Sequence, residues 1–195
     1  MGKIKLGFAL CGSFCTFEPN IVLMERLAED YDILPIMSFN AASLDTRFGM
    51  AADFVSHIEE ICQKPVVRTI EGAEPIGPTH MTDIMLVSPC TGNTLAKLAH
   101  SIVDTPVTMA VKSHLRNNLP VVIAVSTNDA LSGCAKNIGM LANTRNYYFV
   151  PMGQDNPSKK QTSLVAKFEF VPETIKAAQK GVQIEPTVLA PYRDK

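Results

Sequence analysis

Residues 86–99 of the chain read LVSPCTGNTLAKLA, and this stretch decides which fold the rest of the sequence has to form. It begins as an apolar run typical of a buried strand and ends with the spacing of a helix. Between the two lies a short polar segment, residues 89–94, which contains hydroxyl groups, a glycine and an amide. A buried strand that passes directly into a helix through such a segment is typical of the ligand-binding edge of an α/β sheet.

The same alternation of strand and helix repeats along the chain. Apolar runs predict strands at residues 4–10, 33–37, 66–70, 83–87, 121–125 and 147–151. Helical spacing predicts helices at residues 13–31, 48–62, from 93, 106–117, 133–144 and 172–180, with loops at 71–82 and 152–162. This alternation favours a parallel sheet with helices on both faces. We therefore expect a single-domain, Rossmann-like, doubly wound α/β fold over residues 1–195, in which 181–195 form a C-terminal tail.

Four polar segments, which we call crests, follow predicted strands. They are residues 12–13, 38–40, 89–94 and 126–128. In doubly wound sheets, ligands bind outside the carboxyl ends of the strands, near the point where the strand order reverses. Hydroxyl groups and helix amino ends there donate hydrogen bonds to anions, so the crests predict a phosphorylated ligand. The alternative is that Ser13, Ser38 and Asn93 only cap helices.

Composition excludes several other classes of function. The formal net charge of −1 indicates no general affinity for nucleic acid or a membrane surface. No apolar run approaches the roughly 20 residues that span a bilayer, and the N-terminal run is best interpreted as a first strand, so we expect a cytoplasmic protein. Five scattered cysteines and four histidines have no metal-binding spacing, so no metal site is expected. Neither a GxGxxG nor a GxxxxGK[ST] motif is present.

The segment SPCTGNTLAKLAHSIVDTPVT, residues 88–108, resembles the flavin-binding family that includes the cysteine decarboxylases of peptide and coenzyme A biosynthesis. The similarity extends over about residues 3–152. It implies a homo-oligomeric flavoprotein, a trimer or larger assembly, that holds flavin mononucleotide (FMN) where its protomers meet. The positions that it matches to the cofactor site are Gly12, Ser13, Ser38, Asn93, Thr94 and Thr108. The crests add the candidate cofactor residues Asn40, Pro89, Thr91, Gly92, Ser126 and Asn128.

The chain also departs from that family's decarboxylases. Those decarboxylases carry a catalytic histidine several residues before the strand that ends at the crest 89–94. In this chain the corresponding residues, 74–83, read EPIGPTHMTD. His80 is the histidine available to replace it; the alternative is a histidine on a loop. The family's substrate clamp corresponds to VSTNDALSG, residues 125–133, which keeps Asn128 but lacks its proline and methionines. Decarboxylation of a peptidyl cysteine is therefore disfavoured.

One branch of the family, from endospore-forming bacteria, resembles the whole chain. The stretches that carry this resemblance are GFALCGSFCTFE (7–18), residues 88–117, and VSTNDALSGCAKNIGMLANTRNYYFVPMGQDNP (125–157). The resemblance implies a role in oxidising dihydrodipicolinate to dipicolinate in the mother cell of a sporulating bacterium. It also implies a partner, a dehydrogenase-like A subunit that brings its own NAD(P). Two alternatives remain: an accessory protein without catalysis that supports the A subunit, and a flavin-dependent decarboxylase with another substrate.

A dicarboxylate substrate needs a fixed cation or a cluster of N–H donors. Arg145, just before the last predicted strand, and Lys159, in the loop after it, are the residues that we expect to anchor the carboxylates. Solvated surface charge is the alternative for both. For assembly, the apolar residues 108–115 and the pair 140–141 offer contact surface, unless they belong to the core.

Overall fold

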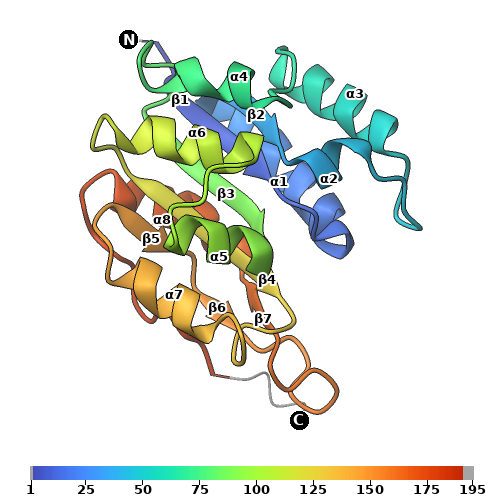
Figure 1. Cartoon of the computed structure of the whole chain (residues 1–195), viewed down its shortest axis with the longest axis vertical. Coiled ribbons are helices and arrows are strands. Elements are labelled where there is room, and N and C mark those ends of the chain that lie inside the picture. Colours follow the sequence, from blue (N-terminus) through green and yellow to red (C-terminus); the bar gives the residue numbers. More distant parts are fainter. Residues whose placement is uncertain (1, 191–195) are drawn as a thin grey trace.

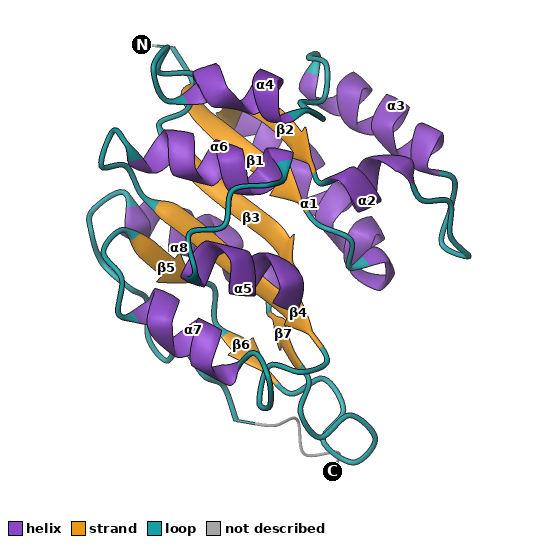
Figure 2. Ribbon diagram, in the orientation of Figure 1, coloured by secondary structure: helices purple, strands orange, loops and turns teal. Residues whose placement is uncertain are grey.

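A computed structural model describes residues 2–190 of the chain. Its sheet has the strand order β2-β1-β3-β4-β7-β6, and β5 pairs with β4 beside β7 (Figures 1 and 2). The first four strands and β5 are parallel, whereas β7 runs antiparallel to β4 and β6 antiparallel to β7. The strands are β1 Ile4–Leu10, β2 Tyr31–Met37, β3 Ile84–Cys90, β4 Val121–Thr127, β5 Tyr147–Phe149, β6 Met152–Gly153 and β7 Leu164–Ala166.

Helices cover both faces of the sheet, as the sequence predicts (Figure 1). Side chains of α1 (Phe17–Asp30), α3 (Ala51–Cys62) and α8 (Val171–Ala178) pack into one hydrophobic core. Those of α4 (Ile70–Ala73), α5 (Gly92–Ala99), α6 (Pro106–Leu115) and α7 (Ala135–Ala142) pack into the other. The expectation of a single-domain, doubly wound α/β fold is confirmed.

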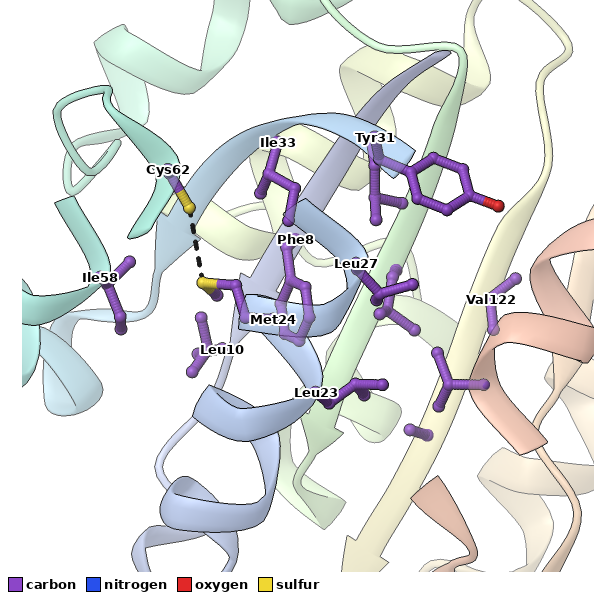
Figure 3. Close-up of a cluster of buried hydrophobic side chains, with 14 of the residues drawn as sticks. Phe8, Leu10, Leu23, Met24, Leu27, Tyr31, Ile33, Ile58, Cys62 and Val122 are labelled. Atoms are coloured by element: carbon purple, nitrogen blue, oxygen red, sulfur yellow. Dashed lines mark hydrogen bonds between the residues drawn. The ribbon is translucent and has the colours of Figure 1, made fainter. Parts of the chain in front are cut away.

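The alternation of the strands explains why both faces are apolar. In β1, Phe8 and Leu10 point into the first core and Ala9 into the second. Figure 3 shows the first core, where Phe8 lies among side chains of α1 and the Cys62 thiol donates a hydrogen bond to Met24 Sδ at 3.4 Å. Each fully buried aliphatic or aromatic side chain of this kind contributes about 1.5–3 kcal/mol to stability. A central strand buried on both faces has to be apolar almost throughout, which is how the sequence pattern revealed it.

Several predicted segments differ from the structure. Residues 66–70 form a single bridge, Ile36 to Val67, instead of a strand. Within the predicted loop 71–82, α4 continues into a 3-10 helix, Glu74–Ile76, and both pack against α6. The five-residue helix α2, Phe39–Ser43, and the short strands β6 and β7 were not predicted. These elements are too short to show a periodic pattern.

The end of the described chain is attached to the sheet. Met152 of β6 donates its N–H to the Thr187 carbonyl oxygen at 2.9 Å, and Leu189 donates to the Met152 carbonyl oxygen at 2.8 Å. Part of the predicted tail therefore pairs with β6, whereas residues 191–195 lie outside the described residues. No helix within residues 2–190 is long and apolar enough to cross a membrane.

Candidate functional site

The strand order reverses between β1 and β3, and the crests of these two strands meet there. From β1 the chain continues to β2 on one side, while β3 lies on the other. The Cys11 N–H donates to the Pro89 carbonyl oxygen at 3.2 Å, and the Ser38 N–H donates to the Leu10 carbonyl oxygen at 3.0 Å. These bonds connect the first three crests at the carboxyl edge of the sheet.

A cavity of about 490 Å³, which we call the switch-point cavity, opens between these crests. Its volume lies within the ~300–1,000 Å³ typical of small-molecule sites. Beyond the crests, Lys97 and Asp104 line it and form an ion pair at 2.8 Å. Six of the residues predicted to bind a cofactor line this cavity: Gly12, Ser38, Asn40, Thr91, Asn93 and Thr94.

The hydroxyl groups of this cavity cap helices and line the cavity at the same time. Ser38 Oγ accepts the Ala41 N–H at 3.3 Å, and Thr91 Oγ1 accepts the Thr94 N–H at 3.4 Å. The Asn93 side chain, by contrast, is exposed in the first turn of α5. Capping and ligand binding are compatible for Ser38, since its capping oxygen retains its own O–H as a donor, whereas the Thr91 hydroxyl donates to Thr94 Oγ1 at 3.2 Å.

Thiol groups lie directly beneath the cavity. Thr94 Oγ1 donates to Cys11 Sγ at 3.2 Å. Burial raises the pKa of Cys11 to about 11 and raises that of Cys90 well above its ordinary value. Both side chains are therefore neutral thiols at pH 7, and neither has the thiolate character of a nucleophile.

Gly92 permits a close approach between the start of α5 and the segment that follows β4. A Cβ atom at this position would lie 2.7 Å from Cys134 Sγ and 2.8 Å from both Asp129 Oδ1 and Thr127 Oγ1. Hydrogen bonds from Thr127 and Cys134 lower the pKa of Asp129, against the smaller opposing effect of its burial. A carboxylate thus lies at the amino end of α5, where its charge is favourable. The sequence prediction stopped at Asn128 and missed it.

A second cavity, of about 510 Å³, lies on the other side of the β1 crest; we call it the β4–β7 cavity. The predicted residues Ser13, Ser126 and Asn128 line it, and Gly12 and Thr91 border both cavities. The hydroxyl oxygens of Ser13 and Ser126 are 2.8 Å apart and share a hydrogen bond. The predicted cofactor residues are therefore divided between two adjoining cavities.

Three further predicted residues are accounted for by their local structure. Thr108 is buried and forms a capping box with Thr105 at the start of α6, so it is Thr105 that lines the switch-point cavity. Pro89 is part of β3 and offers its carbonyl oxygen to Cys11. Gly92 is buried and provides the space described above.

His80 and Arg145 both lie at the opposite edge of the sheet from the crests of the same chain. The loop alternative describes His80, and the role of Arg145 as an anchor stays a prediction. The His80 carbonyl oxygen accepts a hydrogen bond from Lys5 Nζ, at the amino ends of β1 and β3. Arg145 precedes β5, whose first residue pairs with the first residue of β4. It lines a separate cavity with Asn146 and Gly181.

Whether Lys159 anchors a carboxylate also stays a prediction. Its side chain is exposed and is not part of the lining of the β4–β7 cavity. The next residue, Lys160, does line that cavity and pairs with Asp155 at 2.9 Å. Among residues 2–190, no group of three or more His, Cys, Asp or Glu side chains could hold a metal ion.

A doubly wound sheet with polar cavities at its switch point is the arrangement in which α/β proteins bind small ligands, nucleotides among them. The Flavoprotein family model matches residues 1–177, and the chain belongs to this family. Over 190 residues it is 42% identical to the B subunit of dipicolinate synthase from Bacillus subtilis (strain 168), in an alignment that covers 97% of this chain and 95% of that protein.

Solved structures agree with this relationship. The crystal structure of the dipicolinate synthase B subunit from Bacillus halodurans C matches 98% of this chain and 100% of its own, with a TM-score of 0.88 and 41% identity. The FMN-dependent cysteine decarboxylase SpaF matches 90% of this chain and 97% of its own, with a TM-score of 0.66 and 20% identity. The second likeness concerns the fold alone.

Proposed function

We propose that the chain binds FMN in the switch-point cavity and acts with the dipicolinate synthase A subunit in the oxidation of dihydrodipicolinate to dipicolinate. The observation that carries this proposal is the convergence of three crests on one cavity at the β1–β3 switch point. Family membership supports the flavin, and the similarity to the B subunit of dipicolinate synthase supports the reaction. NAD(P) would be bound by the partner protein.

The residues present fit a flavin nucleotide. Ser38 and Asn40 would donate hydrogen bonds to it from the β2 crest, and Asn93 from the first turn of α5. The space that Gly92 leaves free keeps the α5 crest close to the segment after β4. Asp129 adds negative charge at the start of α5, so the phosphate would be held by Ser38 and Asn40 of the β2 crest instead. Bound FMN would supply an acceptor for a hydride.

The neutral crest thiols and the histidine's position limit the chemistry of the chain itself. Cys11 retains its proton at pH 7, and His80 lies at the far edge of the sheet. A cysteine decarboxylase reaction is therefore a weaker candidate than an oxidation, in which the flavin receives the hydride. An accessory role, in which the chain only supports the A subunit, is favoured by one observation: the Lys97–Asp104 ion pair leaves neither group free as an acid or base in the switch-point cavity.

Assembly into a trimer or larger oligomer is part of the proposal. The predicted contact residues of α6 are mostly core, since Thr108, Ala110 and Val111 are buried. Of the predicted pair 140–141, Leu141 is buried and Met140 is exposed. A different surface is apolar and exposed: the segment from α2 to the start of α3. Its large side chains are 44–52% exposed: Phe39, Leu44, Phe48 and Met50. We expect light scattering to give a trimer or larger, and a monomer at micromolar concentration would contradict it.

Absorbance of the purified protein tests the flavin. A bound or reconstituted flavin absorbs between the near ultraviolet and the blue, and the loaded chain should then support dipicolinate formation with the A subunit. A colourless protein that cannot be reconstituted, yet is still required for dipicolinate formation, would overturn the flavin assignment and leave the accessory role.

A further inference from the structure

Part of the lining of the β4–β7 cavity comes from the segment between β6 and β7, which extends to the carboxyl edge of the sheet. β7 pairs antiparallel with the end of β4, so that Val165 lies opposite Ser126. This pairing carries residues 154–163, between β6 and β7, to the side of the β1 crest (Figure 1). A loop distant in sequence thereby contributes Asp155, Lys160 and Ser163 to a cavity whose other wall belongs to the crests.

The cavity carries one cation and two hydroxyl donors that other described residues do not use. Lys160 is the single Lys or Arg among its lining residues, and its ammonium group is held 2.9 Å from Asp155 Oδ2. Hydroxyl groups also line the cavity, but those of Thr16, Thr91 and Thr127 donate to other atoms of the chain. The hydroxyl donors left for a ligand are Ser163 and one member of the hydrogen-bonded pair Ser13 and Ser126. Such a set, with a fixed ammonium at one side, is complementary to an oxygen anion.

Ser163 is the clearest sign that a ligand is expected. The residue is 1% exposed, and its hydroxyl oxygen makes no hydrogen bond with any described residue. It lies near Asp155: burial raises the pKa of that carboxyl, but hydrogen bonding by Lys160 and the approach of the Ser163 hydroxyl together lower it. A buried polar group without a partner costs about 1–3 kcal/mol, so native proteins retain one where something else satisfies it.

The balance of charge favours a carboxylate over a phosphate. Lys160 and Asp155 compensate one another, so the lining carries no excess positive charge. A doubly charged phosphate would be repelled by Asp155, whereas a singly charged carboxylate can share the ammonium group and accept from neighbouring hydroxyls. Gly12 and Thr91 border both cavities, so a ligand in one adjoins a ligand in the other.

We propose that the β4–β7 cavity binds a carboxylate of the substrate, with Lys160 as its ionic partner and Ser163 as a buried hydrogen-bond donor. This inference rests on the proposed function, since it places the dicarboxylate beside the flavin. It assigns the role of carboxylate anchor to Lys160 and Ser163, which line one cavity, in place of Arg145 and Lys159.

Titration calorimetry of the full chain with pyridine-2,6-dicarboxylate tests the inference, with and without saturating FMN. Ser163→Ala should weaken dicarboxylate binding about tenfold, because it removes one hydrogen bond to a charged group. The same change should leave thermal stability unchanged or higher, since the hydroxyl has no partner to lose. Lys160→Gln should weaken binding at least as strongly. Lys159→Gln, which alters net charge equally but lies outside the lining, is the matched control and should change affinity less than twofold.

The outcomes separate this subsite from the flavin site. Weaker dicarboxylate binding with unchanged FMN affinity in both variants supports the inference, and it would do so even if the wild type bound no flavin. Lower FMN affinity with unchanged dicarboxylate binding would overturn it and assign the cavity to the flavin phosphate. Equal effects of Lys159→Gln and Lys160→Gln would also overturn it, because they would indicate long-range charge alone.

Discussion

The two edges of the sheet use similar residue types for different purposes. At the carboxyl edge, serine, threonine and asparagine side chains line two cavities. At the amino edge, polar groups bond to the backbone: Asp83 accepts the Lys5 N–H at 2.8 Å, and the Asn117 amide donates to the Gly77 carbonyl oxygen at 2.8 Å. The direction of the strands, more than residue type, separates the groups available to a ligand from those committed to the fold.

Buried His114 shows the same principle near the amino edge. Its Nε2 lies 3.0 Å from the Pro120 carbonyl oxygen, which can only accept, so Nε2 carries the proton. Its Nδ1 then accepts from Thr82 Oγ1 at 2.8 Å. The histidine joins the end of α6 to the segments that enter β3 and β4. It is a structural residue despite its chemically versatile side chain.

Alanine at Gly77 and at Gly92 should give the sharpest contrast between the edges. A Cβ at Gly77 would lie 1.9 Å from the Ser113 carbonyl oxygen, a backbone atom that cannot move aside, so we expect Gly77→Ala to lower the free energy of unfolding by about 3 kcal/mol. The Gly77→Ala molecules that do fold should bind FMN with the affinity of the wild type. Gly92→Ala should cost about 1–2 kcal/mol but reduce FMN affinity more than tenfold, because a Cβ would press against Thr127, Asp129 and Cys134 and shift the start of α5, where Asn93 lines the switch-point cavity. Urea unfolding and flavin fluorescence measure the two effects.

Gly139→Ala is the control for this pair. Nothing lies within 4 Å of a Cβ at Gly139, which is within α7, so alanine should raise stability by about 0.5–1 kcal/mol. If Gly77→Ala and Gly92→Ala reduced FMN affinity equally, the contrast between the edges would be lost.

The pH dependence of stability tests the amino edge alone. Burial lowers the pKa of His114 from 6.5 to about 4, against the opposing effect of its bond to Pro120. Between these values the unfolded chain binds a proton that the folded chain does not. The free energy of unfolding should therefore fall as pH drops from about 6.5 to about 4, by at most about 3 kcal/mol.

Urea unfolding of the wild type and of His114→Gln across this range isolates the histidine from the carboxyl groups. His114→Gln should be less stable than the wild type at pH 7. Its free energy of unfolding should fall less steeply than that of the wild type as the pH drops from about 6.5 to about 4. His57→Gln, on the exposed side of α3, should keep the slope of the wild type. Identical slopes in the wild type and in His114→Gln would refute the assignment.

The sequence predicted the sheet well because long buried strands and amphipathic helices leave a periodic signal. It also located the crests, since each follows such a strand. It failed where position depends on tertiary pairing: Arg145 and His80 precede strands, and only strand direction places them at the far edge. Lys160 and Ser163 reach the site through the antiparallel β7, too short to predict. Asp129 could have been identified from the sequence, because it directly follows Asn128, the last residue of the fourth crest.

Replacing Asn93 by Asp probes the carboxyl edge with little disturbance of the fold. The variant puts a carboxylate into the switch-point cavity and should weaken FMN binding by about 1–3 kcal/mol, which corresponds to roughly five- to 150-fold. Stability should change little, because an acidic residue in the first turn of α5 is favourable to the helix. Asn143→Asp, an equal charge change on an exposed residue after α7, is the control. Unchanged flavin affinity in Asn93→Asp would remove Asn93 from the cofactor site.

Arg145→Gln should have the smallest effect. Arginine can bind a carboxylate through two parallel hydrogen bonds, which made this residue a reasonable anchor when only the sequence was considered. In the structure it precedes β5 at the amino edge, while the carboxylate subsite that we propose lies beyond the carboxyl end of β4. We expect the affinity for pyridine-2,6-dicarboxylate to change less than twofold and the free energy of unfolding by less than about 0.5 kcal/mol, because exposed charges contribute little. A tenfold loss of dicarboxylate affinity would show that a carboxylate is bound at the amino edge. The conclusion that ligands bind at the carboxyl edge alone would then be wrong.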